Sequence, residues 1–494
     1  MRRSSFHTCI LRRARLFQAL LGAWVLAGCS TLPAEERQTL QGKPTTLAVQ
    51  PPPAEVTTPD ERAAAVQPVA TDGAAATPAA DEPFSIHGSL NTRYRVRSGA
   101  GAGDQDLYQS LLLDVGDRKR DGYSAHVMAT LFADLDGRRD RDDQFVFPSL
   151  ADTFNEPVQP LLYQAYVDVD KPPLVNELRV GRQFDYFTPE FAHFDGVRAA
   201  TAPVGASKLV GGVYGGVPVR LYDATESSDS IFGLWGEAQP WSGGRARVDW
   251  MHVDDDDRFG VNSNDLLGAT LWQRLSTSTR VDARYTRLES EDRDVRLRAN
   301  WDDAELDARL QLSFYQLLET QRNFANEFDP LFSVLQEWFP FAQYRVQGSK
   351  GLGEDLRVDA SLDFRRVADD ADEGPFNRNF ERQSLSLVAL DVLAKGLTFT
   401  LTADLWNSDS RDIQTWGIDA TRDLRDGLRW SLGSNYALYR YDLFSNSERD
   451  NVRVWYARLR RDLGRWGVVD LRYDLENFDG ETFHVVLAGV TWRF

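Results

Sequence analysis

Residues 485–494, the last ten of the chain, read Val-Val-Leu-Ala-Gly-Val-Thr-Trp-Arg-Phe. Apolar side chains recur at every second position: Val486, Ala488, Val490, Trp492 and Phe494. Residues two apart in a β-strand share a face, so this stretch predicts a strand with one apolar and one mixed face. Such a strand is typical of a transmembrane β-barrel, which turns one face to lipid and the other to its lumen. An edge strand of a soluble sandwich is the alternative.

The aromatic carboxy-terminal residue points to the same class. Phe494, with Trp492 two positions before it, resembles the signal by which bacterial outer-membrane barrels are recognised for insertion. The resemblance implies that the barrel-assembly machinery is a partner and that these two residues form the insertion signal.

The alternating pattern repeats along most of the chain. It is clearest at 306–314, 356–364 and 397–405, and in these segments the polar face carries charged side chains. Charge on one strand face alone would also fit a soluble sandwich. Because the pattern runs from residue 84 to the last residue with almost no helical interruption, we predict an all-β fold, a single antiparallel transmembrane β-barrel over 84–494.

The connections between these strands alternate in length. We predict short turns at 118–122, 171–176, 241–244, 302–305, 351–354, 394–396, 423–427 and 464–467, and longer loops at 136–160, 254–264, 318–334 and 368–381. Outer-membrane barrels have short periplasmic turns and long external loops. On this register we expect about 22 strands, an even number between about 18 and 24.

Composition supports a barrel and excludes other classes. The chain has a net charge of −18 and a mean hydropathy of −0.42. It has no apolar stretch long enough for a membrane-spanning helix, which leaves a barrel as the way to satisfy backbone groups in lipid. The negative charge disfavours nucleic acid as a partner.

The amino-terminal residues predict export and lipidation. Five Arg precede a short apolar stretch that ends in Leu26-Ala27-Gly28-Cys29, which looks like a bacterial lipobox. We expect residues 1–28 to be a lipoprotein signal peptide, with Cys29 lipidated and Ser30 directing the chain to the outer membrane. A plain signal peptide is the alternative. Residues 29–83 lack aromatic residues and are rich in Pro and Ala, so we expect a disordered tether.

The predicted lumen is wide and charged. A barrel of this size leaves an aqueous channel, and fixed charges in a wide pore select ions and charged solutes. The pore-lining candidates are the charged residues of the polar strand faces: Asp282, Arg284, Arg296, Arg298, Asp307, Arg309, Arg357, Asp359, Asp363, Arg365, Asp470 and Arg472. The alternative is that these residues pair across strands and hold the wall together, at roughly 0.2 to 1 kcal/mol for each pair.

One stretch carries a family resemblance. The runs at 161–169 (LLYQAYVDV), 178–183 (LRVGRQ) and 194–198 (FDGVR) resemble those of porin-like barrels of the alginate-export type. The resemblance covers only residues 161–198 and implies an outer-membrane channel. It departs from the pattern after Gln183, where Phe184-Asp185-Tyr186-Phe187 replaces a polar continuation, so no substrate-binding role is carried over. Gly181, Gly196, 211–212 and 215–216 are expected to permit bending or close packing.

No catalytic or metal site is predicted. The six His are scattered singly, and the only cysteines are Cys9 and Cys29, which leaves the barrel itself without thiols. The acidic run 254–257 could bind Ca²⁺, but it lacks an EF-hand spacing and is better interpreted as a solvated external loop. We expect no cofactor and no enzymatic activity.

Three functions remain from the sequence. The first is an outer-membrane channel for charged or polymeric solutes, either for diffusion or for polysaccharide export. The second is a barrel that sheathes a partner polypeptide and is tethered to a periplasmic complex, and the third is a surface enzyme. A sheath should show an apolar inner patch, whereas a conduit should have polar walls. Lipid and lipopolysaccharide of the outer membrane are the expected surroundings.

Overall fold

The computed structural model describes residues 85–99, 101–136, 157–172, 175–186, 188–219, 229–257, 260–322, 337–374, 377–408, 411–424, 427–437, 440–442, 447–449, 452–478 and 480–494. The predicted signal peptide, Cys29 and the whole predicted tether lie outside the described residues.

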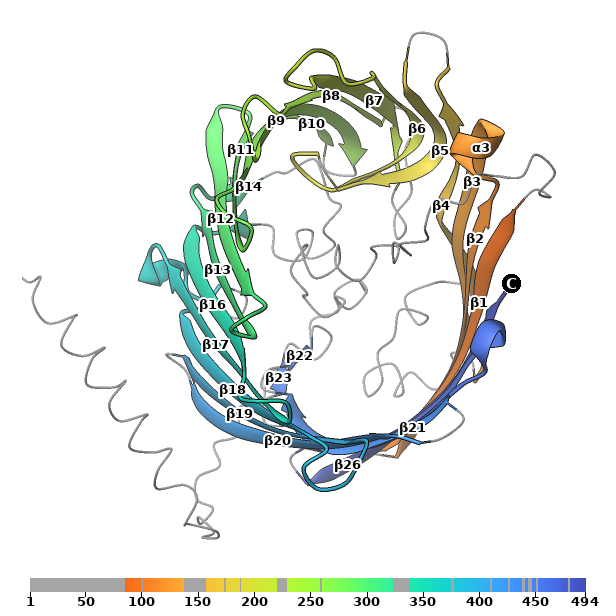
Figure 1. The fold of residues 1–494 in the computed structure, drawn as a ribbon, viewed down its shortest axis with the longest axis vertical. Coiled ribbons are helices and arrows are strands. Elements are labelled where there is room, and N and C mark those ends of the chain that lie inside the picture. Colours follow the sequence, from red (N-terminus) through yellow and green to blue (C-terminus); the bar gives the residue numbers. More distant parts are fainter. Residues whose placement is uncertain are drawn as a thin grey trace, which may run out of the picture. The chain divides into compact units, whose positions relative to one another are not determined.

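Twenty-two antiparallel strands close into a barrel (Figure 1). Its strands are β1 (Ile86–Gly99), β2 (Ala102–Val115), β3 (Tyr123–Asp134), β4 (Val158–Asp170), β5 (Glu177–Asp185), β6 (Ala192–Ala200), β7 (Val210–Pro218), β8 (Ser230–Ala238), β9 (Gly244–Asp257), β10 (Gly260–Arg274), β11 (Thr279–Leu288), β12 (Glu291–Asp303), β13 (Ala308–Leu317), β16 (Phe341–Gly351), β17 (Leu356–Val367), β18 (Phe380–Leu390), β19 (Leu397–Ser408), β20 (Arg411–Asp423), β21 (Leu428–Ala437), β24 (Val452–Asp462), β25 (Gly467–Phe478) and β26 (Glu481–Arg493). The predicted all-β barrel and its strand number are confirmed.

The barrel closes where its last strand meets its first. β26 pairs with β1 from Ser89 opposite Arg493 to Gly99 opposite Phe483. Beyond this register, the Gly88 amide donates to the Phe494 carbonyl at 2.8 Å. Every strand of this sheet therefore has a hydrogen-bonded neighbour on both sides, as a backbone surrounded by lipid requires.

Two further pairs of short strands lie outside this ring in the pairing pattern. They are β14 (Gln321–Arg322) with β15 (Glu337–Trp338), and β22 (Arg440–Asp442) with β23 (Ser447–Arg449). Helical structure is limited, among the described residues, to α3 (Arg118–Asp121) and the 3₁₀ turns η2 (Asp370–Asp372) and η4 (Gly464–Trp466). No helix in this described part is long and apolar enough to cross a membrane.

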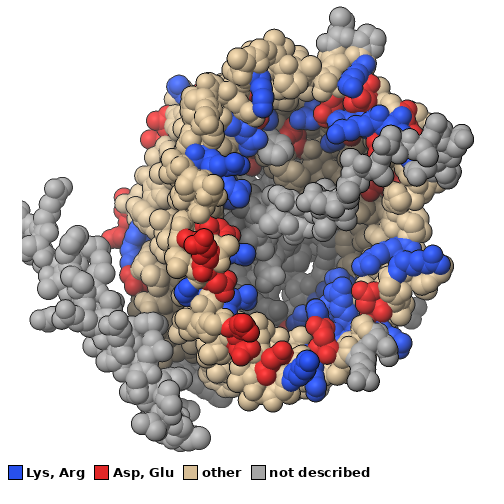
Figure 2. Space-filling model, in the orientation of Figure 1, with Lys and Arg blue, Asp and Glu red and all other residues tan. Residues whose placement is uncertain are grey.

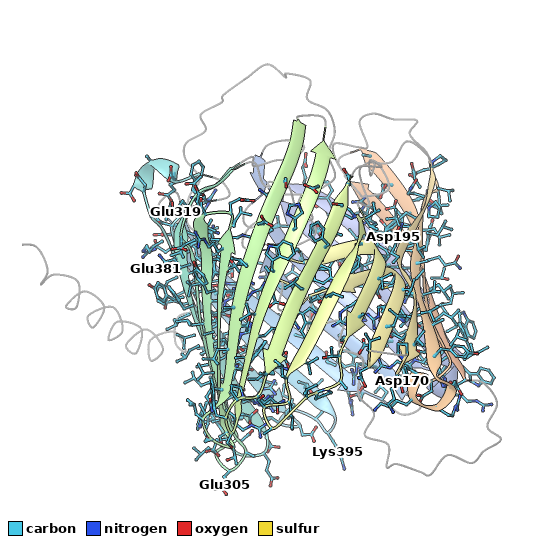
Figure 3. All side chains as sticks on the ribbon, turned by 90° about the horizontal axis from the view of Figure 1, so that it is seen from above. Asp170, Asp195, Glu305, Glu319, Glu381 and Lys395 are labelled. Atoms are coloured by element: carbon cyan, nitrogen blue, oxygen red, sulfur yellow. The ribbon has the colours of Figure 1, made fainter. Side chains whose placement is uncertain are left out.

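The two ends of the barrel differ in their connections. Asp170, Glu305 and Lys395 mark one end, here called the turn end, and Glu319 and Glu381 mark the opposite loop end (Figure 3). The predicted long loop 368–381 connects β17 and β18 at the loop end, whereas most of 136–160 and 318–334 lies outside the described residues. The predicted loop 254–264 is wrong, because β9 runs to Asp257 and β10 starts at Gly260. These two long strands continue their ladder as far as Asp257 opposite Gly260.

Candidate functional site

The strand register separates two faces of the barrel wall. Large apolar side chains that remain exposed, such as Leu234, Val248, Leu401 and Leu471, lie on one face. The positions between them carry most of the charged pairs, and Figure 2 shows Lys, Arg, Asp and Glu side chains along the inner wall of the ring. The exposed apolar face is therefore the outer face, suited to lipid, and the charged face is the inner face.

Most inner-face charges are paired with charges on adjacent or nearby positions. Arg345 donates to Asp363 at 2.7 and 2.9 Å, and Asp363 also accepts from Gln343 at 2.9 Å. Further pairs are Arg97–Asp104, Arg179–Asp168, Arg247–Asp249, Arg382–Asp404, Arg458–Asp470 and Arg472–Asp474. The wall is thus charged and internally balanced over much of its circumference.

The sequence-predicted candidates lie mainly on this face. Asp282 is opposite Arg298, with their charged atoms 4.0 Å apart, and Arg284 is opposite Arg296. Arg365 stacks on Phe341 at 3.6 Å and donates to Asn377 at 3.3 Å. The candidates placed in strands on the inner face are Asp282, Arg284, Arg296, Arg298, Arg309, Arg357, Asp359, Asp363, Arg365, Asp470 and Arg472.

Asp307 is the exception. The alternating pattern predicted that a strand begins at Leu306, but a turn occupies 304–307 and β13 begins at Ala308. Asp307 has a left-handed backbone (φ 45°), and its carboxylate packs against Gly351. The placement of Asp307 in a strand was therefore wrong, because periodicity does not locate the end of a turn.

A row of glycines runs across the wall at β5, β6 and β7. Gly181 is opposite Gly196, which is opposite Gly216. A Cβ built on Gly196 would lie 2.1 Å from the Gly215 carbonyl oxygen, and one on Gly181 would lie 2.2 Å from that of Ala165. Gly181 also has a positive φ of 125°. The expected role of these glycines in close backbone approach is confirmed.

The connection between β5 and β6 folds into the barrel. The Arg284 guanidinium, on β11, donates to the Thr188 carbonyl at 2.8 Å and to that of Pro189. Pro189 also packs on Gly268 of β10, since a Cβ built on that glycine would lie 3.5 Å from the Pro189 Cβ. A segment between β5 and β6 can contact β11 only by reaching across the interior of the barrel. We call residues 188–191 the inserted segment.

Glu190 of the inserted segment enters a group of arginines. Its carboxylate pairs with Arg293 at 2.5 Å, and Arg284 and Arg296 are close enough to interact electrostatically. Burial raises the pKa of Glu190, but Arg293 and Arg296 outweigh burial, so the pKa lies below its ordinary value. A bulge between Thr286 and Arg287 makes Arg293 the extra residue of β12.

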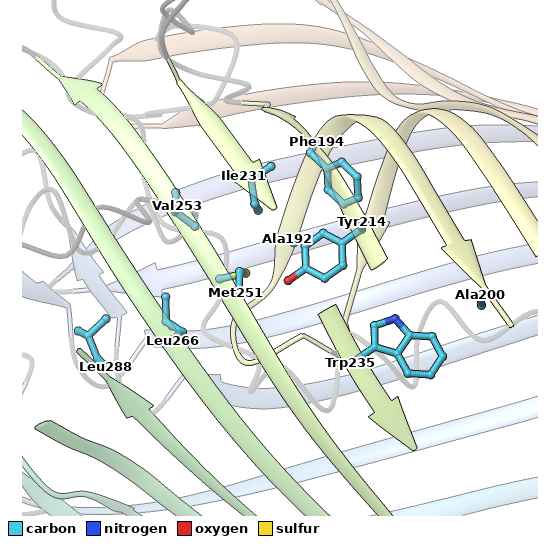
Figure 4. Packing of buried hydrophobic residues seen from close by; sticks show 10 residues of the cluster. All are labelled: Ala192, Phe194, Ala200, Tyr214, Ile231, Trp235, Met251, Val253, Leu266 and Leu288. Atoms are coloured by element: carbon cyan, nitrogen blue, oxygen red, sulfur yellow. The ribbon is translucent and has the colours of Figure 1, made fainter. Parts of the chain in front are cut away.

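An apolar cluster lies on the same side of the barrel. Its side chains come from β6 to β11 (Figure 4): Ala192, Phe194, Ala200, Tyr214, Ile231, Trp235, Met251, Val253, Leu266 and Leu288. All are at most 9% exposed. Tyr214 and Trp235 pack against Gly233 and Gly212 of neighbouring strands. This inner patch is covered by the protein itself, so it belongs to the core.

Sequence reasoning missed the inserted segment with Glu190 and Arg293. No local pattern in the sequence signals this segment, because it reaches β11 and β12 only through the tertiary fold.

The two predicted insertion-signal residues lie at the turn end of β26. Trp492 and Phe494 are 49% and 56% exposed. The Phe494 ring lies against Gly88, where a Cβ would approach it to 2.6 Å. Their role in recognition stays a prediction. Within the described ranges, no group of three or more His, Cys, Asp or Glu is placed to hold a metal ion.

The closed ring of strands with an apolar outer face defines the class of protein, an outer-membrane β-barrel. No known family model matches the sequence, and no curated protein matches it either.

Several solved barrels are similar in structure. The translocation pore of the P pilus usher PapC has a TM-score of 0.44 and 9% identity, over 83% of this chain and 99% of that one. Acinetobacter baumannii OccAB3 has a TM-score of 0.39 and 11% identity, over 83% and 99%. Pseudomonas aeruginosa OpdK, solved with vanillate, has a TM-score of 0.40 and 10% identity, over 83% and 98%. With TM-scores of this size, the assignment of the fold is based on the strand pairing within this chain and not on these similarities.

Proposed function

We propose that this protein is an outer-membrane channel that passes charged or polymeric solutes, with polysaccharide export as the specific case. The observation that carries the proposal is the inner face, on which paired Arg and Asp side chains alternate with Ser, Thr and Gln. A wall of this kind stays hydrated, and fixed charges on it act on ions and charged solutes.

Polymer passage has a further source of support. A hollow of about 370 Å³ on the inner wall near the turn end is lined by amide and hydroxyl side chains, including Asn300, Gln311 and Ser361, together with the charged Asp302, Arg309 and Asp359. The amides and hydroxyls donate and accept hydrogen bonds, and charges of both signs stand beside them. The residues that would line the path are the candidates on the inner face.

The sheath hypothesis has less support. It requires an apolar inner patch that a partner polypeptide can cover. The described inner apolar cluster, which includes Phe194 and Leu266, is already buried. Lipidation of Cys29, the tether at 29–83 and a periplasmic complex remain proposals, and they are compatible with a channel.

Single-channel conductance of the purified mature protein in planar bilayers tests this function, with the reversal potential measured under a salt gradient. Large, ion-selective steps are the expected result. Heat-modifiable, correctly folded protein that gives no steps would contradict the channel proposal, and would favour a plugged barrel or a sheath.

A further inference from the structure

Three aromatic rings surround Arg453 on the outer face of the barrel. Arg453 is the second residue of β24 and lies opposite Tyr436 of β21. The carbon of its guanidinium group is 3.6 Å from the centroid of the Trp416 ring, 4.4 Å from that of Tyr436 and 5.1 Å from that of Trp455. Contacts of this kind stabilise a cation. Side chains from β20, β21 and β24 thus hold one arginine on the face that is turned to lipid.

The protein does not neutralise this guanidinium group. Its Nη1 donates to the Trp416 carbonyl at 2.7 Å, whereas the buried Nη2 has no hydrogen-bond acceptor. In the part of the chain that the structure describes, no carboxylate forms an ion pair with Arg453. Arg182, another arginine of the outer face, pairs with Asp195 at 2.7 Å. Because a buried charged donor without an acceptor is costly, Arg453 requires an anion from outside the chain.

The place of Arg453 along β24 puts it at the membrane surface. The outer positions of this strand are Arg453, Trp455, Ala457, Leu459 and Arg461, so apolar side chains lie between two arginines. At about 3.3 Å per residue, the two arginines are roughly 26 Å apart along the strand. This separation is comparable with the apolar band of an outer-membrane barrel, which is about 25 Å tall and bordered by aromatic residues. Arg453 therefore lies at the headgroup level on the loop-end side.

We propose that Arg453, with Trp416, Tyr436 and Trp455, binds a phosphate group of lipopolysaccharide. The loop end of an outer-membrane barrel faces the cell exterior, and lipopolysaccharide is the phosphate-bearing lipid of the outer leaflet. A guanidinium group binds phosphate through charge-assisted hydrogen bonds, and Nη2 can donate one of them. This site lies outside the lumen and does not depend on the proposed channel function.

Access to the arginine is controlled by the rings around it. Arg453 is only 7% exposed, whereas Trp416 and Trp455 are 47% and 45% exposed. Exposed side chains change rotamer within nanoseconds, so rotation of either indole ring opens Nη2 to a phosphate group at the same depth. The acyl chains of the lipid would then lie along the apolar outer face of β24.

Native mass spectrometry of the full chain in detergent, titrated with lipid A, tests this site. Lipid A carries phosphate groups of lipopolysaccharide, and a chelator removes the divalent cations that would mask them. Arg453→Gln should bind lipid A at least about tenfold more weakly than the wild type, as expected for the loss of a charge-assisted hydrogen bond. Arg453→Lys keeps the charge but loses the planar donor group, so its affinity should lie between the two.

Three controls separate phosphate recognition from other causes. Arg461→Gln removes an exposed outer-face arginine at the opposite end of β24, and it should bind lipid A like the wild type. Lipid A without its phosphate groups should bind the wild type and Arg453→Gln equally. Inorganic phosphate at matched ionic strength should not displace lipid A, since it lacks acyl chains. Displacement would assign the site to free phosphate and overturn the proposed lipid.

Heat modifiability would show that each variant is folded, and Arg453→Lys carries the comparison if Arg453→Gln does not fold. Equal affinity of the wild type and the folded Arg453 variants for lipid A would overturn the inference, whatever the conductance of the protein. Single-channel conductance of Arg453→Gln should match that of the wild type. A protein that binds lipid A through Arg453 but does not conduct would contradict the proposed function and leave this site intact.

Discussion

Gly196 and Gly216 face each other across β6 and β7 so closely that neither can carry a side chain. A Cβ on Gly196 would lie 2.1 Å from the Gly215 carbonyl oxygen, and a Cβ on Gly216 would lie 2.1 Å from that of Asp195. The close pairing of β6 and β7 therefore depends on glycine at both positions.

Gly196→Ala should destabilise the barrel by about 1 to 3 kcal/mol or more, because the two strands must separate to admit the methyl group. Urea unfolding in lipid vesicles measures this free energy. Gly236→Ala, in β8, is the control, since a Cβ there would have no atom within 4 Å. Equal stability of the two variants would mean that β6 and β7 separate at this point without a cost in free energy.

Arg345 and Asp363 should be coupled in stability. Asp363 is only 6% exposed and forms an ion pair with Arg345. Arg345→Ala should therefore lower the free energy of unfolding by about 1 to 3 kcal/mol, because it leaves the buried carboxylate without this cation. The double variant Arg345→Ala/Asp363→Ala should lose less than the sum of the single variants.

The same double-mutant cycle on Arg309 and Asp302 provides the comparison. Their side chains are 76% and 62% exposed, and such pairs contribute about 0 to 1 kcal/mol. A coupling energy as large as that of Arg345 and Asp363 would contradict the importance of burial.

Charge reversal at Arg298 should change ion selectivity. Arg298 lies on the inner face, 4.0 Å from Asp282, with part of its side chain in solvent. Arg298→Glu should move the reversal potential toward cation selectivity, because a negative group replaces a positive one on the wall. Arg461→Glu, at an exposed outer-face position near the turn end of β24, should leave the reversal potential unchanged.

Acidification should release the inserted segment. The pKa of Glu190 is raised by burial but lowered further by Arg293 and Arg296, and Arg284 and Asp294 also face this region. The pKa of Glu190 in the docked state is below its ordinary value. The charged carboxylate therefore stabilises docking at any pH above that ordinary pKa. This stabilisation is lost as the pH falls through the lowered pKa.

Single-channel conductance measured from about pH 7 to about pH 3 would show this change. Other acids titrate over the same range, so the informative quantity is the difference between the wild type and Glu190→Gln. Identical pH profiles of the two proteins would rule out Glu190 as the group responsible.

Phe494→Ala should reduce the yield of folded barrel. The Phe494 backbone exchanges two hydrogen bonds with Gly88, at 2.8 and 3.1 Å, and its ring covers that glycine where β26 meets β1. The fraction of heat-modifiable protein in outer membranes measures the yield. Trp466→Ala, which removes an aromatic ring 57% exposed at the turn end, should have a smaller effect.

The sequence was sufficient for much of the fold. Alternation of apolar and charged residues is a local property with a period of two, so it predicts strands such as 397–405 and separates their two faces. The same alternation placed Arg296, Asp363 and Arg472 on one face. The alternation gave a wrong prediction at Asp307, which lies in a turn, and at 254–264, where two long strands continue. Both features depend on strand pairing rather than on periodicity.

Tertiary structure alone decided what lies inside the barrel. Glu190 and Arg293 are separated by some hundred residues and meet because the connection between β5 and β6 reaches β11 and β12. No local pattern in the sequence records this contact. The sequence by itself determined a closed, membrane-facing barrel, since backbone hydrogen bonding in lipid permits few alternatives. The contacts of the inserted segment required the positions of strands far apart in the chain.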